Sequence, residues 1–186
     1  MVERYFSKMH EGGLILMTVL LMMGLAIQSA SAADIDPFVG DYSGSLDLNN
    51  SGAKEKRDMS VQISKDKDGF TVIWESTVHK PNGRIKTKSY SIDFVPTDRA
   101  HIFSSAMKTN VFGHAVPLDP MVGDPYVWAR ITGDTLTVFS LHVDEEGGYE
   151  LQQYNRTLTE EGLNLDYQSI RNGKILKSIS TLLRKN

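Results

Sequence analysis

The stretch MSVQISKDKDGFTVIWE, residues 59–75, contains two short runs in which apolar and polar residues alternate. Val61 and Ile63 mark the apolar positions of the first run, and Val72 and Trp74 those of the second. Alternation with a period of two is typical of a β-strand that buries one face. The Asp-Gly step between the runs favours a tight turn and is expected to supply its positive φ. The stretch therefore predicts a β-hairpin whose turn spans residues 65–69.

The same stretch resembles a calcium-binding loop of the EF-hand type. Ser64, Asp66, Asp68, Gly69 and Glu75 stand at ligand and turn positions of that motif. An EF-hand loop connects two helices, whereas both flanks here alternate as strands. A strand rises about 3.3 Å per residue, so it places Glu75 roughly 20 Å beyond Gly69. We therefore expect a hairpin and no calcium site.

Alternating runs and turn signals continue along the chain, for example in residues 89–94 and 163–168 and at the Gly-Gly and Asn-Gly steps at 147–148 and 172–173. No window after residue 33 sustains the spacing of an amphipathic helix. We predict an all-β fold, an antiparallel up-and-down meander of about eight to ten strands. Closure of the meander into a barrel removes unpaired edges, so a closed or nearly closed barrel is expected, with a sandwich as the alternative.

The N-terminus has the order of a secretory signal peptide. Arg4 and Lys8 precede an uncharged apolar run at residues 14–27, and small residues follow at 29–33. The run is shorter than the about 20 residues that a membrane-spanning helix needs. We expect cleavage near Ala32, which removes residues 1–32 and leaves residues 33–186 as a single barrel domain. The expected location is periplasmic or secreted, without stable membrane insertion after processing.

Composition excludes several classes of function. The chain has no cysteine, so it forms no disulfide and offers no thiolate to a metal or a substrate. Its formal net charge is −3, without long runs of one sign, which argues against a nucleic-acid partner. An outer-membrane barrel is disfavoured because Lys177 lies between Ile175 and Ile179 on one strand face.

Residues 108–125 interrupt the strand pattern. Three prolines and two glycines in this segment disfavour any long strand or helix, yet the segment is too apolar for a solvated loop. One interpretation is a hydrophobic flap that plugs one end of the barrel. The other is a flap that gates a ligand, with Phe112 and His114 in contact with it.

The strand after this segment carries the candidate ligand-binding residues. Tyr126, Trp128 and Arg130 alternate and therefore share one face. Together with His142, this group would bind a ligand that has an apolar body and a carboxylate. The alternative is a buried aromatic layer, with Arg130 reaching solvent or stacking on Trp128.

No catalytic residue, metal site or cofactor is predicted. Histidines are scattered without the spacing of metal ligands, and three S-x-x-K sequences lack the helix and the companion motifs that this chemistry requires. A small barrel enzyme would have to use His142, Arg130 and Tyr126.

The start of the expected domain, FVGDYSG at residues 38–44, resembles the G-x-W opening of lipocalins and related calycin barrels, with Tyr42 in place of tryptophan. Arg184 resembles the arginine that those folds pack over the aromatic ring. The chain departs from lipocalins in its strand number, in having no C-terminal helix and in lacking a disulfide. The resemblance implies a cup that holds a small apolar or amphipathic ligand.

Three classes of function follow. The first is an exported soluble barrel that binds a small apolar or amphipathic ligand. The second is an envelope interaction or structural module with a filled core and a protein partner. The third is a small barrel enzyme. Ligand uptake separates the first from the second, because a filled core leaves no cavity.

Overall fold

The computed structural model describes residues 34–50, 53–67, 69–105, 108–109, 115–116 and 118–186. The predicted leader, residues 1–32, lies outside the described residues. The elements are η1 (Asp36–Phe38), β1 (Gly40–Asn50), β2 (Ala53–Asp66), β3 (Gly69–His79), β4 (Ile85–Pro96), β5 (Ile102–Ser105), β6 (Lys108–Thr109), β7 (Ala115–Val116), η2 (Pro120–Val122), β8 (Tyr126–Thr132), β9 (Thr135–Val143), β10 (Tyr149–Thr159), β11 (Gly162–Arg171) and β12 (Lys174–Lys185). None of the described helices is long and apolar enough to cross a membrane.

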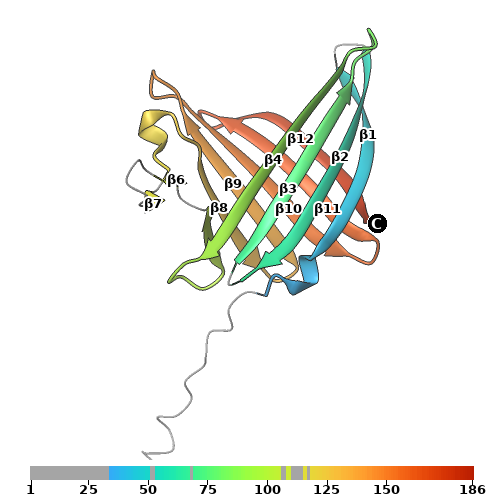
Figure 1. Ribbon diagram of the computed structural model, residues 1–186. Helices are drawn as coiled ribbons and strands as arrows, with labels where there is room; N and C mark the ends of the chain where they lie inside the picture. Colours follow the sequence, from blue (N-terminus) through green and yellow to red (C-terminus); the bar gives the residue numbers. More distant parts are fainter. Residues whose placement is uncertain (1–33, 51–52, 68, 106–107, 110–114, 117) are drawn as a thin grey trace, which may run out of the picture. The chain divides into compact units, whose positions relative to one another are not determined.

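Ten of these strands form a closed antiparallel barrel in the order β1-β12-β11-β10-β9-β8-β5-β4-β3-β2 (Figure 1). Neighbours in the chain are neighbours in the wall, except that β5 is followed by β8, and β1 pairs with β12 to close the ring. β6 and β7 form a separate two-stranded sheet. The predicted all-β meander and its closure into a barrel are therefore confirmed.

The hairpin predicted at residues 59–75 consists of β2 and β3. Asp66 pairs with Gly69, so the loop between the strands has two residues and is shorter than the predicted 65–69 turn. The positive φ, 43°, belongs to Lys67 and not to the glycine. Gly69 has a different role, because a Cβ there would collide with the backbone oxygen of Phe94. Glu75 pairs with Ser60 far along the hairpin, as expected for a strand.

The buried residues gather at one end of the barrel, which we call the η1 end; it contains η1 and the β2–β3, β8–β9 and β10–β11 turns. Phe70 of β3 lies 5.0 Å, centroid to centroid, from Phe94 of β4 and 5.0 Å from Phe103 of β5. Ile35 and Phe38 in and beside η1 belong to the same core. The plug that fills this end is therefore η1 together with the aromatic core.

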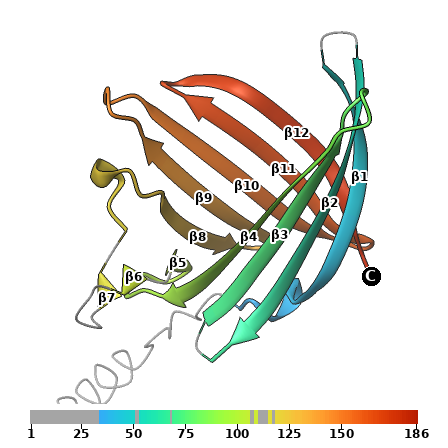
Figure 2. The same cartoon turned by 45° about the horizontal axis from the view of Figure 1, so that its top comes forward.

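At the opposite end, which we call the mouth end, lie the β3–β4, β9–β10 and β11–β12 turns. Among the described residues, two junctions of the wall are short and lie near the η1 end: β1 pairs with β12 at Tyr42 and Ser43, and β4 pairs with β5 at Phe94, Val95 and Pro96. We call these two junctions the seams. Towards the mouth end, strands β1–β4 and β8–β12 spread apart (Figure 2). The barrel is thus packed at one end and wide at the other.

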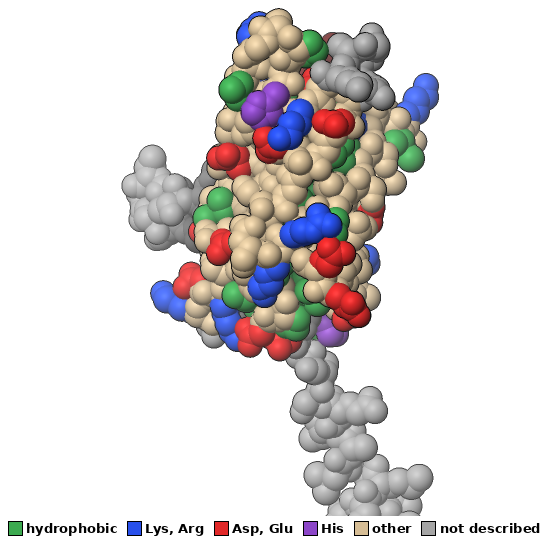
Figure 3. Space-filling view, turned by 90° about the vertical axis from the view of Figure 1, so that its right-hand side faces the viewer, with side chains coloured by type: hydrophobic (Ala, Val, Ile, Leu, Met, Phe, Trp, Pro, Cys, Tyr) green, Lys and Arg blue, Asp and Glu red, His purple; other side chains and the backbone are tan. Residues whose placement is uncertain are grey.

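The exterior of the barrel mixes charges of both signs with many uncharged side chains, as the face in Figure 3 shows. Ion pairs on the outside include Lys65 with Asp36 at 2.7 Å and Arg184 with Glu161 at 3.0 Å. Exposed pairs of this kind contribute little to stability, so they do not determine the fold.

The expected packing of Arg184 over Tyr42 is wrong by one residue. Arg184 points outward to Glu161, whereas the Lys185 ammonium lies 5.6 Å from the centre of the Tyr42 ring. Lys185 also donates a hydrogen bond to the carbonyl of Val39, and the Tyr42 hydroxyl donates to that of Phe38. Adjacent strand residues face opposite sides, so only one of the two cations can reach the ring.

The described residues of the interrupted segment, residues 108–125, form only short regular elements, namely β6, β7 and η2, in line with the prediction. A side-chain oxygen of Asp119 accepts a hydrogen bond from the Met121 backbone N–H and caps η2. Met121 and Val122 are 71 % and 75 % exposed. These two residues therefore do not plug the barrel; Phe112 and His114 lie outside the described residues.

Candidate functional site

A cavity of about 270 Å³ lies inside the barrel between the η1-end core and the mouth end. Its side chains come from β2, β3 and β4 on one side and from β10, β11 and β12 on the other. The residues that border it are Arg57, Met59, Ser60, Val61, Trp74, Glu75, Ser76, Val78, Lys86, Lys88, Tyr90, Gln152, Tyr154, Arg156, Leu165, Tyr167, Lys177, Ile179 and Leu183. The cavity exists because the two groups of strands diverge above the aromatic core.

Aromatic rings form the middle of the cavity wall. Trp74 of β3 stacks on Tyr90 of β4 with centroids 5.1 Å apart, and it lies 5.7 Å from Tyr154 of β10. Tyr154 lies 4.7 Å from Tyr167 of β11. Burial raises the pKa of both tyrosines, so their hydroxyls stay neutral at physiological pH. The site thus offers ring faces with neutral polar tips.

Arg156 of β10 lies one inward-facing position deeper than Tyr154, and only 2 % of its surface is exposed. Its guanidinium carbon is 5.6 Å from the Tyr154 ring centre and 6.0 Å from that of Trp74. Among the described residues, neither its Nε nor its Nη1 has a hydrogen-bond acceptor. Burial lowers the pKa of Arg156 to about 10, so the group remains charged at neutral pH.

Further cations lie nearer the mouth end. Arg57 of β2 contacts Glu55 at 3.5 Å and donates to the hydroxyl of Ser76, but its Nε has no acceptor among the described residues. Burial lowers the pKa of Lys177 on β12, and the positive charge of Arg57 lowers it further. Lys86 and Lys88 of β4 border the same cavity and are exposed.

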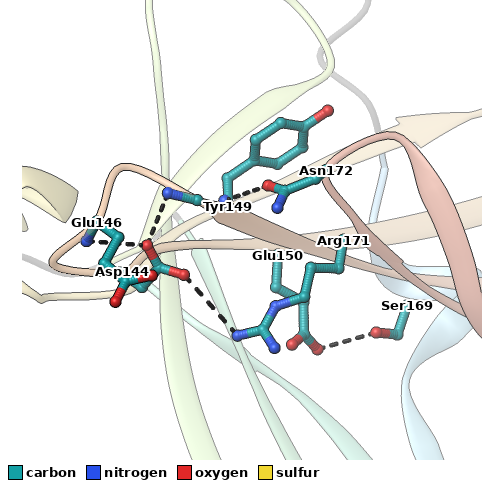
Figure 4. A network of polar contacts seen from close by, with 8 residues as sticks. Asp144, Glu146, Tyr149, Glu150, Ser169, Arg171 and Asn172 are labelled. Carbon is teal, nitrogen blue, oxygen red and sulfur yellow. Dashed lines mark hydrogen bonds and ion pairs between the residues drawn. The ribbon is translucent and has the colours of Figure 1, made fainter.

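A polar network holds the mouth end together near β10 and β11 (Figure 4). Glu150 accepts hydrogen bonds from the Gln152 side-chain amide and from the Ser169 hydroxyl, each at 2.9 Å. Asp144 accepts from backbone amides within its own turn and contacts Arg171. The hydrogen bond from Gln152, followed by that from Ser169, lowers the pKa of Glu150. The carboxylate of Glu150 is therefore already paired.

Replacing Ser169 by alanine is expected to raise the pKa of Glu150 and to lower the free energy of unfolding at neutral pH by about 1 kcal/mol. A carboxyl whose pKa is lowered in the folded state stabilises the protein above the unfolded pKa of about 4.3. This stabilisation is lost as the pH falls through the folded-state pKa. The difference between wild type and Ser169→Ala should therefore be smaller at an acidic pH below about 4.3 than at neutral pH.

Urea unfolding at both pH values measures this effect. Ser180→Ala, an exposed serine on the outer face of β12, is the matched control. An equal loss at both pH values would show that the Ser169 hydroxyl acts through packing alone.

The structure places the predicted residues Tyr126, Trp128 and Arg130 together, but on the outer face of β8. Val127 and Ala129 alternate with them and are buried in the core. Trp128 stacks on Phe139 of β9 at 4.8 Å, and the Arg130 guanidinium lies 5.9 Å from the Phe139 ring centre. Tyr126 is 43 % exposed. The aromatic side chains form a layer, but it lies on the outer face and is not buried as the alternative predicted. Arg130 is exposed and lies over Phe139, not over Trp128.

His142 lies on the other face of the sheet from Tyr126. Leu141, the neighbour of His142 on β9, pairs with Tyr126 and therefore shares the face of Tyr126. His142 lies on the opposite face together with Ser140, and the Ser140 hydroxyl is 3.3 Å from the His142 Nε2. His142 is exposed and does not border the interior cavity. The described candidates therefore do not converge on one ligand.

Sequence reasoning missed Arg156 and the Tyr154–Tyr167 pair. The available signal was alternation, since Tyr154, Arg156 and Leu158 occupy every second position of one strand. A charged residue at an inward position of a strand is unusual and marks a candidate site. Among the described residues, no group of three or more His, Cys, Asp or Glu side chains is arranged to hold a metal ion.

Comparisons of the chain with protein-family models, with curated proteins and with solved structures find no match. The function therefore has to be argued from the geometry and chemistry of the cavity.

Proposed function

We propose that this protein is an exported barrel that binds a small apolar or amphipathic molecule in its interior cavity. The observation that supports the proposal is the aromatic wall of Trp74, Tyr90, Tyr154 and Tyr167 around a cavity of about 270 Å³. Ligand pockets are concave, mostly apolar and aromatic, and carry a few polar groups that orient the ligand. A cavity of about 150 Å³ already binds benzene, so this one has room for roughly two fused rings.

We also propose that the barrel is related to the lipocalin-like barrels. The surroundings of Tyr42, two residues after Gly40, support it. The Tyr42 hydroxyl donates a hydrogen bond to Phe38 of η1, and Lys185 of β12 lies over the ring. Export is the second part of the proposal, and it rests on the signal-peptide pattern of residues 1–32. A chain without cysteine needs no oxidation to fold in the periplasm or outside the cell.

One observation favours the second candidate, an interaction module of the cell envelope. The outer layer of Tyr126, Trp128 and Phe139 is a partly exposed aromatic surface of the kind that is enriched in protein interfaces. The two candidates differ in where a small molecule makes contact: the cavity or the outer face.

The two tryptophans of the chain provide the test, because Trp74 borders the cavity and Trp128 lies on the outer face. Trp128→Phe leaves Trp74 as the only tryptophan, and Trp74→Phe leaves Trp128. Each variant is titrated with bromonaphthylmethanol, a neutral probe whose bromine quenches fluorescence at contact.

We expect saturable quenching of Trp74 and none of Trp128. Quenching of neither tryptophan would contradict binding in the cavity. Quenching of Trp128 alone would favour the interaction module.

A further inference from the structure

The least compensated group in the cavity is Arg156. It is buried and charged, it contacts aromatic rings on two sides, and among the described residues two of its nitrogens have no acceptor. Burial of a charge is costly unless the charge is paired and hydrogen-bonded. Cation–π contacts offset part of this cost, but they leave the N–H groups without acceptors.

We propose that the ligand carries one anionic group of the carboxylate type, and that this group binds Arg156 below the aromatic wall. This inference rests on the proposed function, since it names the class of ligand that the same cavity takes. The apolar body of the ligand lies against Trp74 and Tyr154, and the anion accepts hydrogen bonds from the guanidinium.

The other charges of the cavity agree with this assignment. Arg57, Lys86, Lys88 and Lys177 lie towards the mouth end and surround the path to Arg156. A concave surface lined by one sign of charge attracts ligands of the opposite sign. The acidic groups near the cavity do not face Arg156 unpaired. Glu55 contacts Arg57, and Glu150 accepts from Gln152 and Ser169. Glu75 borders the cavity but is exposed and alternates on β3 with the inward-facing Trp74. They do not neutralise Arg156.

Arg156 lies deep in the cavity without a second cation beside it, so we expect the ligand to carry a single negative charge. Its cross-strand neighbours on β9 and β11 are Leu136 and Leu165, both buried, so no second cation is paired with it there. A single buried positive charge balances one negative charge, whereas a doubly charged phosphate would carry an uncompensated charge into the apolar end of the cavity. A carboxylate or a sulfonate fits this balance.

A pair of probes of nearly equal size tests the inference. Bromonaphthoate carries a carboxylate where bromonaphthylmethanol carries a neutral hydroxymethyl group. With Trp74 as the only tryptophan, we expect the anion to bind about ten-fold or more tightly than the alcohol. Arg156→Met should abolish this preference and leave binding of the alcohol within about two-fold, because a methionine of similar length keeps the cavity apolar.

Arg130→Met is the control, since it removes the same charge from the outer face of β8. It should retain the preference for the anion. Arg156→Met should also keep or raise the midpoint of thermal unfolding, because replacing an unpaired buried charge by an apolar side chain is often neutral or stabilising. A variant that still binds the alcohol is folded.

The outcomes separate the two claims. Equal binding of both probes by the wild type, or an anion preference that survives Arg156→Met, would overturn the assignment to Arg156 and leave cavity binding intact. Quenching of Trp74 by neither probe would overturn cavity binding itself. Loss of alcohol binding in Arg156→Met together with a lower unfolding midpoint would show that the arginine has a structural role.

Discussion

Phe70→Ala is expected to lower the free energy of unfolding by about 3–5 kcal/mol. The ring is fully buried and contacts Phe94 and Phe103, so it connects β3 to β4 and β5 at the seam that closes the barrel. Truncation removes the aromatic contacts and leaves a cavity that the flanking strands cannot fill. Domains of this size are stable by only about 5–15 kcal/mol, so the loss is a large share of the total.

Chemical unfolding followed by far-UV circular dichroism measures this change. Ile85→Ala on β4 is the control, because that side chain is 65 % exposed and its removal should cost less than about 0.5 kcal/mol. A loss below about 1 kcal/mol for Phe70→Ala would mean that the η1 end is not tightly packed.

Gly162→Ala is expected to destabilise the protein by about 2–4 kcal/mol. Gly162 begins β11 with φ at +148°, a conformation that residues with a Cβ rarely adopt. A Cβ there would also collide with the backbone oxygen of Leu183. Both the turn after β10 and the pairing of β11 with β12 would have to shift.

Gly173→Ala separates the cost of the positive φ from the cost of the collision with the neighbouring strand. Gly173 also has a positive φ, +77°, but no described atom lies within 4 Å of the position of its Cβ. We expect the free energy of unfolding of this variant to fall by about 1 kcal/mol, because only the unfavourable backbone conformation contributes. If the two alanine variants lost equal stability in the same urea titration, the close approach of β12 to Gly162 would have no energetic consequence.

Much of the fold could be predicted from local sequence because alternation and turn residues act over a few positions. The hairpin of β2 and β3 was found this way, and the absence of helical flanks excluded the EF-hand interpretation. One detail could not be predicted. Gly69 looked like a source of positive φ, but its small size serves contact with Phe94 on a neighbouring strand. Such tertiary contacts leave no local pattern.

The candidate site was harder to predict for a related reason. Alternation divides a strand into two faces, but it does not tell which face lies inside. Tyr126, Trp128 and Arg130 were correctly placed on one face, and the buried Val127 and Ala129 show that this face is the outer one. The available clue was the size of the side chains. The interior near the η1 end is already filled by phenylalanines, so the small Val127 and Ala129 fit inside and the larger Tyr126 and Trp128 lie outside.

The short seams between the two groups of strands would determine how the proposed ligand enters and leaves. Because the described residues join β1–β4 to β8–β12 near the η1 end, a small rotation about that end would change the width of the mouth without breaking pairs elsewhere in the wall. A cavity of this kind would accept ligands of different size, so selectivity would come from charge and ring stacking more than from ligand length.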